Sequence, residues 1–130
     1  GMSEKIVVGI VVKDYDVLLV KRKFSEGDLI WTFPSGKIEP NETEKEAIIR
    51  EVLEETNISC LPVKRIGERK HPNTQKTLTY WLCEYEQGKI KINTKEEIDE
   101  VIWVKPDVAF KKITSDIFQP VKEILLQLHK

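Results

Sequence analysis

The chain has 130 residues, of which 40% are hydrophobic and 33% charged, so we expect one compact globular domain over residues 1–130. Its formal net charge of −1 at pH 7 gives no general positive field for a phosphate backbone, which argues against a polymeric nucleic-acid partner. The longest apolar run, over residues 6–12, is too short to cross a membrane, and no signal peptide is predicted, so a cytoplasmic location is expected.

Strands rich in valine and isoleucine are predicted in the first quarter of the chain. Residues 5–13 and 17–23 should form a hairpin joined by a polar turn. After a loop over 24–30, residues 31–33 should form a short strand that ends at a proline. The first residue, Gly1, is interpreted as a residue added for expression and is left out of the predicted fold.

A helix is predicted over residues 43–56, because Thr43 and Glu46 have the spacing of a capping box. Strands on both sides of this helix, with a further helix at the end, argue for a mixed sheet covered on both faces, which is an α/β fold. The later elements are two strands flanking a turn at 71–74, one more strand and an amphipathic helix, at 62–70, 76–86, 100–104 and 120–129.

The predicted helix over 43–56 carries three carboxylates along one edge. At about 100° per residue, Glu51, Glu54 and Glu55 fall within an arc of roughly 100°. Carboxylates at this spacing repel one another, and a hard cation such as Mg²⁺ would reverse the repulsion. The alternative interpretation is an ordinary solvated acidic face. The opposite side is expected to pack on the core through Ile48, Ile49, Val52 and Leu53.

The segment over residues 36–58 resembles the box of the Nudix hydrolase family, G-x5-E-x7-R-E-U-x-E-E-x-G-U, in which U is a bulky apolar residue. Asn57 stands where the family has glycine, and asparagine is the next-best residue for the left-handed turn expected there. The resemblance implies an α/β/α sandwich with a mixed β-sheet and the box helix against it. The matching residues are Gly36, Glu42, Arg50, Glu51, Val52, Glu54, Glu55 and Ile58.

This resemblance implies hydrolysis of a nucleoside diphosphate linked to another group, with Mg²⁺ as the cofactor and Mn²⁺ as an alternative. By the family pattern, Glu51, Glu54 and Glu55 are metal ligands. Glu51, or a residue outside the box, would accept the proton of the attacking water. Arg50 would orient a carboxylate, and an ordinary surface salt bridge is the competing interpretation.

Residues 31–39, WTFPSGKIE, resemble the MutT-like branch, which hydrolyses nucleoside triphosphates to the monophosphate and pyrophosphate. Ser35 replaces a glycine at a position where the family can offer its backbone carbonyl to the metal, so the carbonyl of Ser35 is a further candidate ligand. Arg22 matches a branch position that contacts phosphate, and Lys37 is a second candidate for substrate binding.

Glu97 lies six residues before Trp103, the spacing at which MutT-like proteins carry an additional metal or base glutamate. A solvated acidic loop is the competing interpretation. The carboxylates that compete for the same assignment are Glu96, Asp99 and Glu100.

Phe118 falls near the position where enzymes specific for oxidised guanine carry an asparagine that reads the base. Phenylalanine cannot make those hydrogen bonds, so we expect a stacking wall and no 8-oxo-dGTP specificity. His71, beside a predicted turn, is interpreted as an ordinary loop residue. Three aromatic residues of one predicted strand either stack on a base or pack in the sheet, namely Tyr80, Trp81 and Tyr85.

Other substrates and a non-catalytic role compete with nucleoside triphosphate hydrolysis. The ADP-ribose branch carries a proline some fifteen residues past the box, and Pro72 lies fourteen past Ile58. Dinucleoside polyphosphates are a further alternative. A module that binds a nucleotide without cleaving it would be expected to lose box carboxylates, which this chain retains. The sequence does not indicate an oligomeric state.

Overall fold

A computed structural model describes residues 4–23, 29–71 and 74–128. The prediction for Gly1 and parts of the predicted loop, turn and last helix lie outside these ranges. The helices and strands of the described residues are β1 Lys5–Lys13, β2 Asp16–Lys23, β3 Leu29–Thr32, β4 Ser35–Lys37, α1 Glu44–Thr56, β5 Ser59–Lys70, β6 Thr77–Gln87, β7 Ile98–Val104, α2 Pro106–Lys112 and α3 Gln119–Leu126.

The strands form one mixed sheet. Its order is β3-β2-β1-β6-β5, with β4 paired to β1 and β7 paired to β2. Strands β1 and β6 run parallel, while the other pairs are antiparallel. The predicted hairpin is confirmed, because Val12 of β1 stands opposite Val17 of β2.

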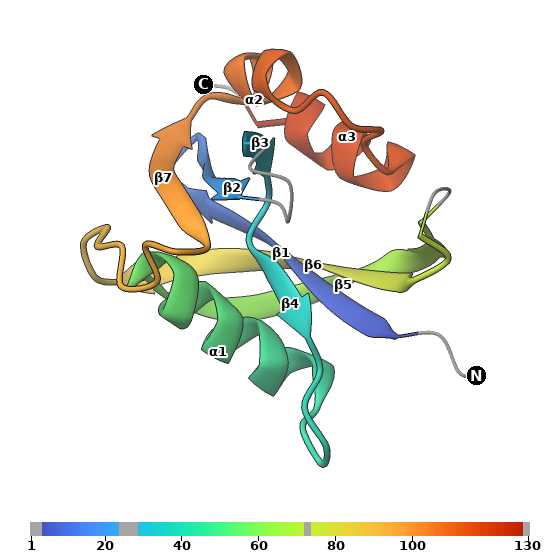
Figure 1. Cartoon of the computed structure of the whole chain (residues 1–130). Helices are drawn as coiled ribbons and strands as arrows, with labels where there is room; N and C mark the ends of the chain where they lie inside the picture. The colour runs from blue at the N-terminus through green and yellow to red at the C-terminus, as the bar shows by residue number, and fades with distance from the viewer. Residues whose placement is uncertain (1–3, 24–28, 72–73, 129–130) are drawn as a thin grey trace.

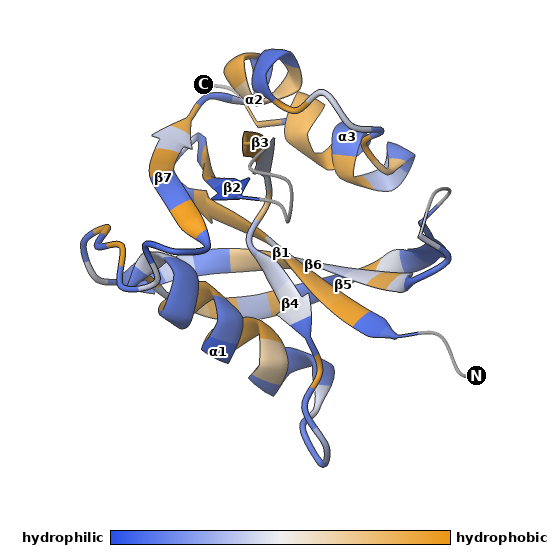
Figure 2. Cartoon of the chain, viewed as in Figure 1, coloured by the Kyte–Doolittle hydropathy of each residue, from blue (hydrophilic) through white to orange (hydrophobic). Residues whose placement is uncertain are grey.

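Helices cover both faces of the sheet, with α1 on one side and α2 and α3 on the other (Figure 1). Successive residues of β1 alternate between the two cores: Val7 packs under α1, and Val8 packs under α2 and α3. Figure 2 accordingly shows hydrophobic colour along the middle of β1 and hydrophilic colour at its start. The predicted α/β/α sandwich is therefore confirmed.

Helix α1 is rotated relative to the predicted orientation. Ile48 and Val52 are buried as expected, whereas Ile49 and Leu53 are 38% and 44% exposed, so that part of the prediction was wrong. Gly9 of β1 explains the close approach, because a Cβ atom there would lie 3.2 Å from Cγ2 of Val52. With Val52 over the sheet, Ile48 one turn before it and Glu55 and Thr56 one turn after it face inward. The buried residues of α1 are Ala47, Ile48, Val52, Glu55 and Thr56.

The predicted ends of α1 are confirmed. The amide of Glu46 donates to Oγ1 of Thr43 at 3.1 Å, and the amide of Thr43 donates to Oε1 of Glu46 at 2.8 Å, which completes the capping box. Asn57 follows the helix with φ 68° and ψ 14°, in the left-handed region. Its Nδ2 also donates to the carbonyl oxygen of Lys89 at 2.9 Å.

Replacing Asn57 with valine is expected to destabilise the protein by about 1–2 kcal/mol, because a β-branched residue is poorly tolerated in the left-handed region. Asn57→Gly should be close to neutral, since glycine relieves the backbone while the hydrogen bond to Lys89 is lost. Urea unfolding of both variants measures the difference. Equal stability of the two variants would contradict the geometry assigned to this helix end.

Two elements were absent from the predictions. Strand β4 has three residues rich in turn-forming types, and its extended shape comes from pairing with β1, where Ser35 stands opposite Val8. Helix α2 has a proline in its first turn and spans only seven residues, which is too short to show a clear helical period in the sequence. Strand β3 also begins at Leu29, two residues earlier than predicted. Among the described residues, no helix is long and apolar enough to cross a membrane.

Candidate active site

The acidic edge of α1 faces the short strand β4. Gly36, in the middle of β4, lies against the carboxylate of Glu51, because a Cβ atom at position 36 would lie only 2.1 Å from Cδ of Glu51. Pairing with β1, where Gly36 stands opposite Val7, holds the strand in this position. The glycine of the box therefore leaves open the space that the Glu51 carboxylate occupies.

Arg50 connects the loop before α1, strand β4 and the acidic edge. Its Nε and Nη2 donate to Oε2 and Oε1 of Glu42 at 2.7 and 2.9 Å, a bidentate pair that lowers the pKa of Glu42 to about 2. Its Nη1 donates to Oε1 of Glu51 at 2.7 Å and to Oε2 of Glu54 at 3.4 Å. Nη2 also donates to the carbonyl oxygen of Lys37 at 3.0 Å. This network has the form expected of a residue that orients carboxylates.

The second cluster joins Glu55, Arg22 and Ser35. Glu55 is only 4% exposed, and Nη2 of Arg22 donates to its Oε2 at 2.7 Å. The amide of Ser35 donates to Oε1 of Glu55 at 3.3 Å, and the carbonyl oxygen of Ser35 accepts from Nη2 of Arg22 at 3.4 Å. Burial raises the pKa of Glu55 to about 7, against the opposing effect of Arg22.

The raised pKa of Glu55 predicts a specific dependence of stability on pH. Relative to Glu55→Gln, the wild-type free energy of unfolding should fall by up to about 1.4 kcal/mol per pH unit between about 4.5 and about 7. In this window the unfolded side chain has ionised while the folded one still holds its proton, so the folded state binds more protons. Urea unfolding in EDTA across the window measures this, and a flat difference would contradict the raised pKa.

The carboxylates of Glu51, Glu54 and Glu55 are the type of ligand that a hard cation requires. They do not, however, converge on one point in this structure. Burial raises the pKa of both Glu51 and Glu55, so added positive charge would favour their ionised forms. Among the described residues, no three Asp, Glu, His or Cys side chains converge as metal ligands. Arg50 draws Glu51 and the exposed Glu54 to one side, and Arg22 holds Glu55 on the other. The ligand set therefore stays a prediction.

Two further candidates lie on different sides of this site. Glu97 lies just before β7, where its carbonyl oxygen accepts the amide of Lys23 at 2.8 Å, one residue beyond Arg22. The backbone of Glu97 is therefore close in the fold to Arg22, and its side chain is exposed. The ammonium of Lys37 instead pairs with Oε1 of Glu4 at 3.2 Å, at the start of β1.

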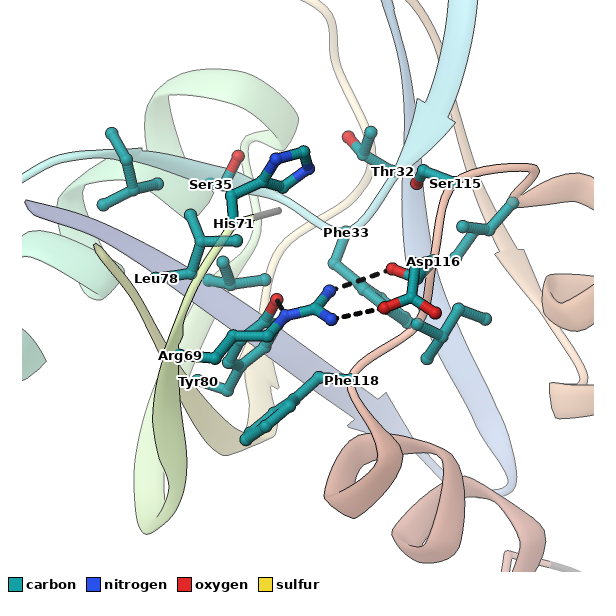
Figure 3. A pocket seen from close by; sticks show the side chains of 14 residues that line it. Thr32, Phe33, Ser35, Arg69, His71, Leu78, Tyr80, Ser115, Asp116 and Phe118 are labelled. Atoms are coloured by element: carbon teal, nitrogen blue, oxygen red, sulfur yellow. Dashed lines mark hydrogen bonds and ion pairs between the residues drawn. The ribbon is translucent and has the colours of Figure 1, made fainter. Parts of the chain in front are cut away.

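A pocket of about 180 Å³ opens beside Ser35, on the face of the sheet that carries α2 and α3 (Figure 3). Oγ1 of Thr32 is buried in its wall and has no hydrogen-bond partner among the described residues. Apolar side chains form most of the lining. The lining includes Phe33, Leu78, Tyr80, Phe118, Thr32, Ser35, Arg69, His71, Ser115 and Asp116.

Phe118 lies in this pocket with its ring stacked on Tyr80, at a centroid distance of 4.8 Å and an interplanar angle of 25°. Arg69 lies over the same rings and donates to the carboxylate and carbonyl oxygens of Asp116 (Figure 3). Its Nε also donates to the hydroxyl of Tyr80 at 3.1 Å. Phe118 is thus part of an aromatic wall, as a base-stacking residue would be.

Arg69 was absent from the predicted site residues, and the structure places it in the pocket wall. His71, interpreted as an ordinary loop residue, lies outside the helices and strands and also lines the pocket. Strand alternation was the available signal, because Gly67, Arg69 and His71 are two residues apart and Gly67 lies against Phe118. The other strand aromatics have packing roles. Nε1 of Trp81 donates to Oε1 of Glu44 at 2.9 Å, and Tyr85 forms an edge-to-face pair with Trp103.

Comparison with known proteins agrees with the resemblance of residues 36–58 to the Nudix box. The family model of the NUDIX domain matches residues 4–124. An 8-oxo-(d)GTP phosphatase of Mycolicibacterium smegmatis is 32% identical over 85 residues, covering 64% of this chain and 26% of that protein. The NAD-capped RNA hydrolase NudC of Haemophilus influenzae is 30% identical over 130 residues, covering 95% of this chain and 48% of that protein. The chain thus spans about half or less of the length of these relatives.

Solved structures share the fold. A NUDIX hydrolase from Nitrosomonas europaea superposes with a TM-score of 0.85 at 22% identity, covering 98% of this chain and 72% of that chain. A MutT protein from Methanosarcina mazei Go1 gives a TM-score of 0.74 at 24% identity, covering 96% of this chain and 94% of that chain. At these identities the similarity shows the architecture alone.

Proposed function

The chain belongs to the NUDIX domain family, and we propose that it hydrolyses the pyrophosphate linkage of a nucleoside triphosphate or related nucleotide and releases the nucleoside monophosphate. The position of Ser35 carries this proposal. Its amide and carbonyl bond to Glu55 and Arg22, while the same residue lines the apolar pocket. A nucleotide with its base in the pocket would therefore direct its phosphates toward the carboxylates.

The residues of the site have distinct roles in this proposal. Mg²⁺, or alternatively Mn²⁺, would be held by Glu51, Glu54, Glu55 and the carbonyl of Ser35, and would supply positive charge for the phosphates and lower the pKa of a bound water. Glu51, whose own pKa is raised by burial, is the first candidate to accept the water proton.

The remaining candidates contact other parts of the substrate or supply an additional carboxylate. Glu97 is the second candidate base or an additional ligand, from the loop beside Arg22. The guanidinium of Arg22 suits phosphate oxygens, and Phe118 with Tyr80 suits the flat face of a base. Arg50 holds the carboxylates in place.

The substrate range follows from the aromatic wall. We expect kcat/KM values within about a hundredfold of one another for several nucleoside triphosphates, because stacking discriminates weakly among bases. Arg69, a charged residue of the wall, is already bonded to Asp116 and Tyr80. A preference of about a thousandfold for 8-oxo-dGTP over dGTP would contradict this and would make Asp116 the first residue to test as a base reader.

A substrate panel with Mg²⁺ tests the proposal, with products separated by chromatography. It should contain NTPs, dNTPs, ADP-ribose, dinucleoside polyphosphates, NAD and a UDP-sugar. Formation of the nucleoside monophosphate from at least one compound is the expected result. Binding without turnover across the panel would overturn the proposal in favour of a non-catalytic nucleotide module. The panel should also contain an NAD-capped RNA, because the relatives include NAD-capped RNA hydrolases. The expectation that the protein has no polymeric nucleic-acid partner therefore stays a prediction.

A further inference from the structure

Two arginines divide the carboxylates of the candidate active site between them. Arg50 binds those on the outer side of α1, whereas Nη2 of Arg22 donates to Oε2 of Glu55 at 2.7 Å. The same Nη2 atom lies 3.4 Å from the carbonyl oxygen of Ser35. Arg22 therefore covers the two oxygens, one from Glu55 and one from Ser35, that the proposed function assigns to the divalent cation.

A guanidinium and a divalent cation exclude one another from these oxygens. Two positive charges within a few ångströms repel strongly where water is excluded, and Glu55 is 4% exposed. An ionised carboxylate so deeply buried also needs a positive partner at all times, since an unpaired buried charge is strongly destabilising. We propose that Arg22 is the resting counterion of the cation site, and that cation binding displaces its guanidinium from Glu55 and Ser35 to a phosphate oxygen of the nucleotide.

The surroundings of Arg22 allow this exchange. Its side chain is 19% exposed, so it is not fully enclosed by the protein. It lies where the pairing of β2 with β7 shifts register, between Lys21 and Arg22. Because Ser35 also lines the pocket, the phosphates of a bound nucleotide would pass beside the guanidinium. Its planar fork of donors suits a phosphate as well as a carboxylate.

This exchange couples the two ligands of the site and rests on the proposed function. A phosphate that binds Arg22 removes the competitor of the cation, and a cation on Glu55 releases Arg22 for the phosphate. Each ligand should therefore raise the affinity of the other, and the coupling should be equal in both directions.

Binding of Mn²⁺, followed by the electron paramagnetic resonance signal of the free ion, tests the inference without any turnover. In the absence of nucleotide, Arg22→Gln should bind Mn²⁺ about fivefold or more tightly than wild type. A non-hydrolysable nucleoside triphosphate analogue should tighten Mn²⁺ binding in wild type, and much less in Arg22→Gln. Weaker or unchanged Mn²⁺ binding by Arg22→Gln would overturn the inference.

Two variants separate displacement from other effects of charge. Lys21→Gln removes the same charge from the neighbouring residue, whose side chain pairs with Glu100 at 3.4 Å, and should leave Mn²⁺ affinity unchanged. Equal tightening by Lys21→Gln would mean a general electrostatic effect and would overturn the inference. If Arg22→Gln fails to fold, Arg22→Lys is the second variant, because it keeps a positive charge but loses the planar fork of donors. The nucleotide analogue should then tighten Mn²⁺ binding less than it does in wild type. An equal tightening in Arg22→Lys and wild type would overturn the inference.

The inference and the proposed function can fail separately. Tighter Mn²⁺ binding by Arg22→Gln without hydrolysis of any substrate would support the exchange at Arg22 and overturn the proposed enzyme activity. Hydrolysis by wild type, with no tightening in Arg22→Gln, would overturn the exchange alone. Failure of every variant to bind Mn²⁺ would overturn both.

Discussion

Replacing Glu51 with glutamine is expected to lower kcat by about 10²–10⁴-fold while leaving the fold intact. The carboxylate lies in the space beside Gly36, where it bonds to Arg50. Glutamine keeps the shape and still accepts the hydrogen bond from Arg50, but it supplies neither the charge of a metal ligand nor a proton acceptor. The effect should therefore appear in kcat at saturating Mg²⁺ and substrate.

The measurement is steady-state hydrolysis of the best substrate of the panel, with circular dichroism as the test of folding. Glu86→Gln is the matched control, because it removes one negative charge from an exposed position on β6. Its kcat should equal that of wild type. A folded Glu51→Gln protein with near wild-type kcat would show that the reaction does not depend on this carboxylate.

Gly36→Ala is expected to lower kcat by about a hundredfold, because displacing a reacting group by about 1 Å has effects of this size. The added Cβ would lie 2.1 Å from Cδ and 2.3 Å from Oε2 of Glu51, so the carboxylate must move. Pairing of β4 with β1 prevents the backbone from moving away instead. The variant thus changes the position of Glu51 without changing its chemistry.

A double variant shows whether the alanine acts through Glu51. If it does, Gly36→Ala combined with Glu51→Gln should be little slower than Glu51→Gln alone, since the displaced group is already inactive. Independent, multiplying effects of the two substitutions would contradict that mechanism. Thermal unfolding of all three variants reports any loss of stability from the crowded strand.

Much of the fold was predictable because its signals are local. Segments rich in valine and isoleucine identified β1 and β2, and the Thr43 capping box placed the start of α1 at the observed residue. The left-handed conformation of Asn57 followed from its place after the helix. Strand β4 was missed because three residues carry no period, and its extended shape comes from a partner strand.

The candidate site was predictable in part, since the box concentrates its residues in one segment. The network of Arg50 with Glu42 and Glu51 lies within ten residues and matches the role expected from the family pattern. The pocket lies outside that segment. Arg69 and Asp116 are 47 positions apart, and only the folding of β5 against the chain before α3 makes them neighbours.

The sequence by itself determined the family, the helix with its caps, and the chemical types of the groups along its acidic edge, because these depend on composition and short spacing. The tertiary structure decided which way the helix is rotated, so that Glu55 is buried while Ile49 and Leu53 are exposed. It also decided that Arg22, 33 positions before Glu55, covers this carboxylate and the Ser35 carbonyl. The physical reason is packing. The close approach of α1 to Gly9 sets the rotation of the helix, and the register of the sheet sets the position of Arg22. Neither the approach nor the register can be predicted from a local sequence pattern.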